Sequence, residues 1–238
     1  MWIKLCANTN PADVQLAVDV AADAVGFVFA RSPRHVTPEQ VAAITPTLPS
    51  DLTHIGVFQS HDRDAIVSIT RTTGLNGIQL HGGLDLPLLD RLRTEFGHSQ
   101  FLIQTLHWAL DADPADAERR LRADLRSLGH HGVADAILLD AKTAAASGGT
   151  GRSFDWSRAR ALLSAEAPKL RIILAGGLTP ANVADAIRTL RPWGVDVVSG
   201  IESSPGKKDP ARVRAFVAAA RDAFAAIENH PLTATQNR

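Results

Sequence analysis

The chain has 238 residues, of which 45% are hydrophobic, which suits one large domain better than two small ones. Lys plus Arg and Asp plus Glu number 25 each, so no net charge recruits nucleic acid or an anionic membrane, and a small-molecule partner is expected. A single cysteine excludes an internal disulfide framework. The N-terminus does not resemble a signal peptide, and no apolar run reaches the roughly 18 residues of a membrane span. These observations predict a soluble cytoplasmic protein.

Eight short apolar runs rich in β-formers follow one another along the chain and are predicted to be strands. They lie at about 2–6, 24–29, 53–58, 76–80, 100–106, 135–139, 171–175 and 194–198. Several are almost wholly apolar, as expected of a parallel sheet covered by helices.

Amphipathic stretches separate these runs, and five open with a capping residue followed by proline. The cap's side-chain oxygen accepts an orphan backbone N–H, and proline loses nothing at the first helical position. The pairs are Asn10-Pro11, Thr37-Pro38, Asp113-Pro114, Thr179-Pro180 and Asp209-Pro210. This punctuation predicts a βα repeat, and eight units in this length favour a single (β/α)8 TIM barrel over residues 1–228. An open, doubly wound sheet is the alternative, because periodicity does not show closure.

Two segments are predicted to lie outside any site. Residues 111–129 are rich in arginine and acid and are typical of a solvated surface helix. After the last predicted helix, at about 209–228, the tail 229–238 is polar and unpatterned and is expected to fray.

Cys6 and Asp140 each close an apolar run, the first and the sixth. Alone, a single cysteine is usually a small buried hydrophobe and an aspartate often caps a turn. If both runs are barrel strands, however, the thiol and the carboxyl group share the rim where barrel enzymes keep their chemistry. Thiolate and carboxylic acid can move a proton between neighbouring sugar carbons, which indicates an isomerase.

Glycines gather after the last three predicted strands. Gly176-Gly177 and Ser199-Gly200 follow the seventh and eighth, where barrels often offer backbone N–H groups to a phosphate, and we predict phosphate binding there rather than tight turns alone. Gly148 to Gly151 lie in a longer loop, which is either a mobile lid or a plain flexible loop.

Read together, these residues resemble phosphoribosylanthranilate isomerase, and the resemblance is ordered from residue 2 to about 225. The matching blocks are Lys4-Leu5-Cys6-Ala7-Asn8-Thr9, Ala24-Val25-Gly26-Phe27-Val28-Phe29 with Arg34, Gln79-Leu80-His81-Gly82, Leu139-Asp140-Ala141-Lys142, Gly148-Gly149-Thr150-Gly151 with Phe154-Asp155-Trp156, Leu174-Ala175-Gly176-Gly177-Leu178, Val195-Asp196-Val197 with Ser199-Gly200-Ile201-Glu202, and Pro205-Gly206-Lys207-Lys208-Asp209.

The resemblance implies a single barrel of tryptophan biosynthesis that needs no cofactor and no metal. It implies an Amadori rearrangement of N-(5-phosphoribosyl)anthranilate to 1-(2-carboxyphenylamino)-1-deoxyribulose 5-phosphate, by a monomer or homodimer. Cys6 is then the general base, Asp140 the general acid, and Arg34 faces the anthranilate carboxylate. Asp140 has to hold a proton near neutral pH, so its pKa must be raised from about 3.9, whereas the group that activates Cys6 is left open.

The sequence leaves the roles of other polar residues near the rim open. Asp196 could hydrogen-bond the substrate amine or a sugar hydroxyl, or form a structural ion pair. His81, at the end of the fourth strand, is not assigned a catalytic role. Lys207-Lys208 either steer the phosphate or decorate a helix start.

The chain departs from the family at three places. Ala7-Asn8 stand where glycine and an apolar residue are usual, Gly82-Gly83 where Gly-Glu is usual, and Val198 where serine is common. Because alanine restricts the backbone more than glycine, we expect Asn8 to supply a compensating hydrogen bond. Two alternatives are kept: an isomerase that also accepts the related histidine-pathway substrate, and a barrel that binds a phosphorylated ligand without turnover.

Overall fold

The computed structural model describes residues 1–143, 146–147 and 154–229. Residues 148–151, where a lid was one of two predictions, lie outside the described residues, as does the tail from residue 230.

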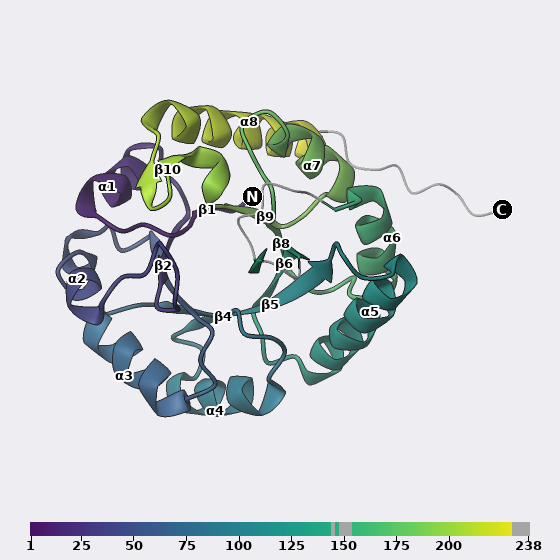
Figure 1. Cartoon of the computed structure of the whole chain (residues 1–238), viewed down its shortest axis with the longest axis horizontal. Helices are drawn as coiled ribbons and strands as arrows, with labels where there is room; N and C mark the ends of the chain where they lie inside the picture. Colours follow the sequence, from purple (N-terminus) through teal and green to yellow (C-terminus); the bar gives the residue numbers. More distant parts are fainter. Residues whose placement is uncertain (144–145, 148–153, 230–238) are drawn as a thin grey trace.

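Eight parallel strands form a closed barrel (Figure 1). They are β1 (Ile3–Leu5), β2 (Ala24–Val28), β3 (Thr53–Phe58), β4 (Gly77–Leu80), β5 (Phe101–Ala109), β6 (Ala136–Thr143), β8 (Ile172–Leu174) and β9 (Gly194–Val197). The barrel closes because β1 pairs with β9 and β5 pairs with β6. All eight predicted strands are confirmed, and the open-sheet alternative is wrong.

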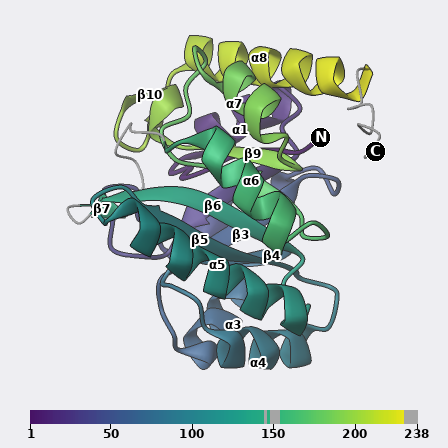
Figure 2. The same cartoon turned by 90° about the vertical axis from the view of Figure 1, so that its right-hand side faces the viewer.

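Helices surround the barrel, as Figures 1 and 2 show from two directions. They are α1 (Pro11–Asp19), α2 (Pro38–Ala42), α3 (Arg63–Thr73), α4 (Leu86–Phe96), α5 (Pro114–His131), α6 (Trp156–Glu166), α7 (Val183–Leu190) and α8 (Pro210–Asn229), with the 3-10 turns η1 (Thr45–Thr47) and η2 (Ser199–Ile201). The short strand β7 (Ala146–Ser147) pairs with the end of β6, and β10 (Glu202–Ser204) with β11 (Lys207–Lys208) forms a separate hairpin. No helix in the described part of the chain has the length and apolar character needed to cross a membrane.

Four of the five predicted cap-and-proline helix starts are confirmed, at α1, α2, α5 and α8. The prediction at Thr179-Pro180 is wrong, because α7 begins at Val183. Asn182 accounts for the delay: its Oδ1 accepts from the Thr179 N–H and its Nδ2 donates to the Gly177 carbonyl, which holds residues 179–182 in a turn.

Two apolar layers hold the fold together. A large layer between barrel and helices includes Ile3, Leu5 and Phe27, and a smaller one inside the barrel includes Trp2, Ile55 and Leu138. Alternation along each strand separates the two layers. The α5 arginines pair with acidic side chains on the helix surface, including Glu166 of α6, as predicted for a solvated helix.

Candidate active site

The first strand points Lys4 into the barrel, on the same side as Cys6, because the two residues are two positions apart. Lys4 is fully buried, and its Nζ donates to Gln79 Oε1 at 2.9 Å and to Asp196 Oδ1 at 2.8 Å. Gly26 on β2 makes room for both side chains, since a Cβ there would lie 2.5 Å from the Cys6 sulfur and 3.1 Å from Lys4 Cε.

Cys6 follows β1 directly and is buried. Burial raises the pKa of its thiol, whereas the charge and hydrogen bond of Lys4 oppose that rise and favour the thiolate. Burial also acts on Lys4, lowering its pKa, but Asp196 and Cys6 outweigh it and raise the pKa overall, which keeps Lys4 charged. Lys4 is thus the neighbour whose charge most strongly opposes the rise in the pKa of Cys6.

Asp140 lies inside β6 rather than at its end, because β5 and β6 both run on and keep pairing through Ala109 and Lys142. Pairing with β8 stops at Leu139, so Asp140 still stands at the rim. Burial, helped by the negative charge of Asp196, raises the pKa of Asp140 to about 7. At this pKa Asp140 can hold a proton near neutral pH, as a general acid must.

His81, directly after β4, and His107, in β5, lie close to Asp140. His81 Nε2 lies 4.0 Å from Asp140 Oδ2, and donor atoms of the three residues lie within 4.8 Å of one another. In the described part of the chain this is the one group of three such residues close enough to hold a metal ion. The acidic member of this group is Asp140, which is also the candidate general acid. Neither β4 nor β5 contains a second acidic residue that could serve as a metal ligand there.

The departure at Ala7-Asn8 has a visible structural consequence. Ala7 has a φ of 61°, in the left-handed region that glycine adopts more readily. Asn8 Nδ2 donates to the carbonyls of Leu5 and Gly26, at 2.8 and 3.2 Å, and thereby holds the loop against β1 and β2. The compensating hydrogen bond expected of Asn8 is present.

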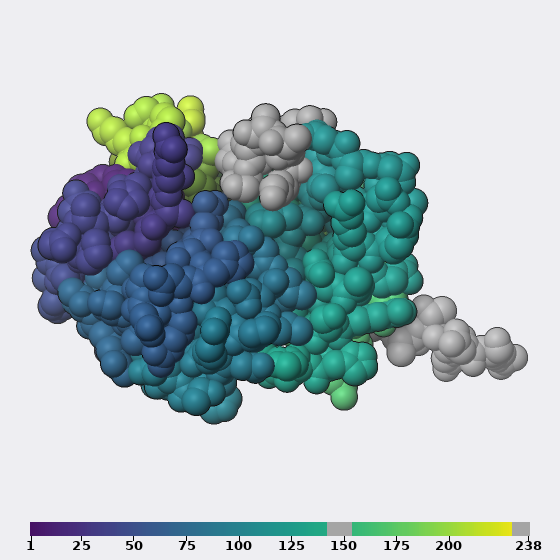
Figure 3. All heavy atoms as spheres, turned by 60° about the horizontal axis from the view of Figure 1, so that its bottom comes forward, coloured from purple at the N-terminus to yellow at the C-terminus, as the bar shows by residue number. Residues whose placement is uncertain are grey.

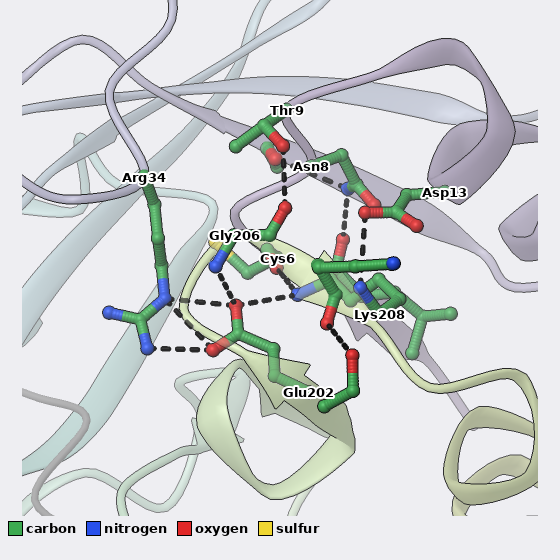
Figure 4. A network of polar contacts seen from close by, with 12 residues as sticks. Cys6, Asn8, Thr9, Asp13, Arg34, Glu202, Gly206 and Lys208 are labelled. Atoms are coloured by element: carbon green, nitrogen blue, oxygen red, sulfur yellow. Dashed lines mark hydrogen bonds and ion pairs between the residues drawn. The ribbon is translucent and has the colours of Figure 1, made fainter.

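Arg34, in the loop after β2, forms a two-pronged ion pair with Glu202 of β10 (Figure 4). Although burial acts to raise it, the pKa of Glu202 is held below its ordinary value by Arg34 and Lys208. Lys208 is buried and donates from Nζ to the Cys6 carbonyl at 2.5 Å. Lys207 is exposed, and both residues lie on β11 rather than at a helix start.

The glycine loops after β8 and β9 meet at the same rim. Gly176 and Gly177 both have positive φ, at 85° and 66°, and a Cβ on Gly200 would lie 1.9 Å from the Leu178 carbonyl oxygen. Only glycine therefore allows this approach of the two loops. They line a recess of about 480 Å³ together with Arg212.

A larger cavity of about 550 Å³ brings the predicted residues together. Its lining includes Cys6, Arg34, Asp140, Gly176, Gly177, Asp196 and Ser199, while Gly200 lies in the adjoining recess. This volume is typical of small-molecule sites.

The family model for N-(5'-phosphoribosyl)anthranilate isomerase matches residues 3–219. A relative of that name from Trichlorobacter lovleyi is 40% identical over 223 residues, which cover 93% of this chain and 98% of the relative. The chain belongs to this isomerase family. The predicted family is confirmed.

Solved phosphoribosylanthranilate isomerases share the barrel. The Thermotoga maritima enzyme is 34% identical, with a TM-score of 0.77 over 93% of this chain and 99% of that one. A second solved isomerase, 31% identical with a TM-score of 0.72 and the same coverage, is in complex with reduced 1-(o-carboxyphenylamino)-1-deoxyribulose 5-phosphate.

Sequence reasoning missed several polar residues of this isomerase's site. Lys4 and Gln79 were quoted within matching blocks but given no role, and Glu202 and Lys208 were not recognised as partners of Arg34 and Cys6. Alternation turns Lys4 to the same side as Cys6 only if the strand stays regular, as β1 does. The Glu202 contact joins residues 168 positions apart, and no local pattern reports such a pairing.

Proposed function

We propose that this chain converts N-(5-phosphoribosyl)anthranilate into 1-(2-carboxyphenylamino)-1-deoxyribulose 5-phosphate, an Amadori rearrangement in tryptophan biosynthesis. The observation that carries the proposal is a single cavity lined by Cys6 and by Asp140, whose pKa is raised to about 7. Membership of the isomerase family supports the same reaction.

In the proposed mechanism Asp140 gives its proton to the furanose ring oxygen, and the ring opens to an iminium ion. Cys6 as thiolate then removes the proton from C2, which leaves an enolamine that tautomerises to the ketose. Each step needs its group in one protonation state: Asp140 protonated and Cys6 ionised. Lys4 supports the second requirement, because its charge favours the thiolate.

Other residues of the cavity bind the substrate. Arg34 pairs with the anthranilate carboxylate, as a planar guanidinium suits a carboxylate. The loops at Gly176-Gly177 and Ser199-Gly200 hold the phosphate, in or beside the recess that Arg212 also lines. Asp196 carries an ion pair with Lys4, and its contact with the substrate stays a prediction.

The base position holds Cys6 instead of a carboxylate, which favours the tryptophan-pathway substrate over a dual-substrate enzyme. A monomeric or homodimeric state and a cytoplasmic location stay predictions from the sequence.

Complementation tests the proposal. The gene should restore growth without tryptophan to a host that lacks this isomerase, and the Cys6→Ala variant should not. A Glu166→Gln variant, which breaks an ion pair between α5 and α6, is the matched control and should grow. A stable wild-type protein that fails to restore growth would leave the ligand-binding barrel as the better account.

A further inference from the structure

Glu202 lies at the start of the β10–β11 hairpin, and its side chain is 3% exposed. Its Oε2 accepts from Arg34 Nη2 at 2.7 Å and from Arg34 Nε at 3.1 Å. Its Oε1 accepts from Arg34 Nε at 2.9 Å and from the Gly206 N–H at 3.2 Å, and lies 3.5 Å from Lys208 Nζ. Both oxygens are thus occupied, and the carboxylate is fixed in place.

Arg34 gives only one edge of its guanidinium to this pair, the edge formed by Nε and Nη2. Its Nη1 points away from Glu202 in Figure 4 and donates no hydrogen bond to a described residue. Arg34 also lines the main cavity, and its side chain is 18% exposed. A guanidinium held side-on by one carboxylate can still bind a second carboxylate end-on, through Nη1 and Nη2.

We propose that Glu202 is a positioning residue, which holds Arg34 so that its Nη1–Nη2 edge is presented to the substrate carboxylate. This inference rests on the proposed function, because it assumes that Arg34 binds that carboxylate. An unpaired arginine would have to lose its rotamer freedom when substrate binds, whereas the paired one has lost it beforehand.

The hairpin connects this arginine to the base. Lys208, which pairs with Glu202 in the register of β10 and β11, donates to the carbonyl of Cys6 itself. Thr9, in the loop after β1, donates from Oγ1 to the Gly206 carbonyl at 2.6 Å. In Figure 3 the dark purple loop after β2 stands beside the yellow-green hairpin at one rim. Glu202 thereby sets the position of Arg34 relative to Cys6.

Two ligands isolate the contribution of the carboxylate: reduced 1-(2-carboxyphenylamino)-1-deoxyribulose 5-phosphate, and its phenylamino counterpart without the carboxyl group. The ratio of their dissociation constants, measured by calorimetry, reports how well the carboxylate is bound. We expect Arg34→Ala to abolish the advantage of the carboxylate. We expect Glu202→Gln to reduce it about tenfold and to leave the binding of the second ligand within about twofold of wild type.

Two further variants separate positioning from stability. Glu166→Gln also removes a buried carboxylate that is paired with arginine, but this ion pair joins α5 and α6 away from the cavity. It should leave the ratio unchanged. Glu202→Asp keeps the charge on a shorter side chain, and should lose less of the ratio than Glu202→Gln. It also supplies the measurement if the glutamine variant does not fold.

The outcomes distinguish the two proposals. If Arg34→Ala abolishes the affinity advantage of the carboxylate while both Glu202 variants keep the wild-type ratio, the positioning role is wrong and the carboxylate site stands. If a Glu202 variant weakens both ligands equally, its role is structural and the inference is overturned. If Arg34→Ala keeps the wild-type ratio, the carboxylate site of the proposed function fails, and this inference fails with it.

Discussion

Burial raises the pKa of both Cys6 and Asp140. A higher pKa suits the proposed acid, Asp140, but not the proposed base, Cys6. Asp140 reaches about 7 and can hold its proton at neutral pH. Cys6 becomes harder to ionise, and the positive charge of Lys4 is what limits this cost. The proposed mechanism needs Cys6 ionised and Asp140 protonated: burial favours the second condition and opposes the first, and the charge of Lys4 reduces that opposition.

Replacing either proton-transfer group should remove turnover without removing binding. Cys6→Ser and Asp140→Asn should each lower kcat by about 100- to 10,000-fold, or about 3–5 kcal/mol in barrier, because serine does not ionise near neutrality and asparagine gives up no proton. The double variant should be little slower than the poorer single one if that residue's step limits the rate. Steady-state kinetics with a product-analogue binding control measures this, and turnover near wild type in either single variant would contradict the assignment.

The pH profile should reflect both protonation requirements. Raising the pH forms the Cys6 thiolate, while raising it past about 7 removes the proton from Asp140, so kcat/KM should be bell-shaped with its optimum above pH 7. In Asp140→Asn the residual activity should rise with pH and lose its alkaline decline. An optimum below pH 6, or an unchanged alkaline limb in Asp140→Asn, would show that other groups titrate.

The sequence was sufficient to nominate Cys6, Asp140 and Arg34, because each stands in a recognisable block at a strand end or just beyond it. It could not report that Arg34 is already paired, since Glu202 reaches it only through the closed barrel. The sequence named Lys207-Lys208 together and could not tell them apart, although Lys207 is exposed and Lys208 is buried.

At the scale of elements, apolar runs located all eight barrel strands but not their ends. β5 and β6 extend beyond the predicted limits because each supplies the other with hydrogen-bonding partners, and that extension depends on pairing rather than on composition. The start of α7 was misplaced because the Asn182 side chain bonds to the Thr179 N–H and the Gly177 carbonyl, which holds residues 179–182 in a turn. The β10–β11 hairpin is too short for any periodicity to reveal.

The end of α1 offers a stability test. Ala21 follows the C-cap with a φ of 51°, and the Ala21 and Ala22 N–H groups donate to the carbonyls of Val18 and Ala17. Glycine suits this exposed left-handed position, so Ala21→Gly should raise the free energy of unfolding by about 0.5–1 kcal/mol. Ala218→Gly, at an exposed site within α8, should lower it by about 1 kcal/mol. Urea denaturation measures both, and equal losses would contradict the assigned backbone strain.

The phosphate loops can be tested at Gly200. A Cβ there would meet the Leu178 carbonyl oxygen at 1.9 Å, so Gly200→Ala must push the loops after β8 and β9 apart. We expect KM for the phosphorylated substrate to rise about tenfold or more. Gly129→Ala, in α5, is the control and should leave KM unchanged, because the nearest atom outside the helix backbone, the Glu166 carbonyl oxygen, is 4.0 Å from the added Cβ. An unaltered KM in Gly200→Ala would place the phosphate elsewhere.

At the scale of the whole molecule, barrel closure makes the site. The seam between β1 and β9 sets Lys4 opposite Asp196 in register, and their side chains pair across 192 positions of sequence. The same seam holds Cys6, whose N–H donates to the Val197 carbonyl at 3.0 Å. Sequence periodicity predicted the strands that form this seam, but the contacts across it depend on closure.

The most direct test of the central claim is to follow ribose C2, which the rearrangement oxidises from a carbinol to a ketone while C1 is reduced. With N-(5-phosphoribosyl)anthranilate labelled with carbon-13 at ribose C2, the purified protein should convert the carbinol resonance into a ketone resonance. The Asp140→Asn protein should do so at least about 100-fold more slowly. A folded wild-type protein that leaves the C2 resonance unchanged would contradict the proposed isomerase reaction.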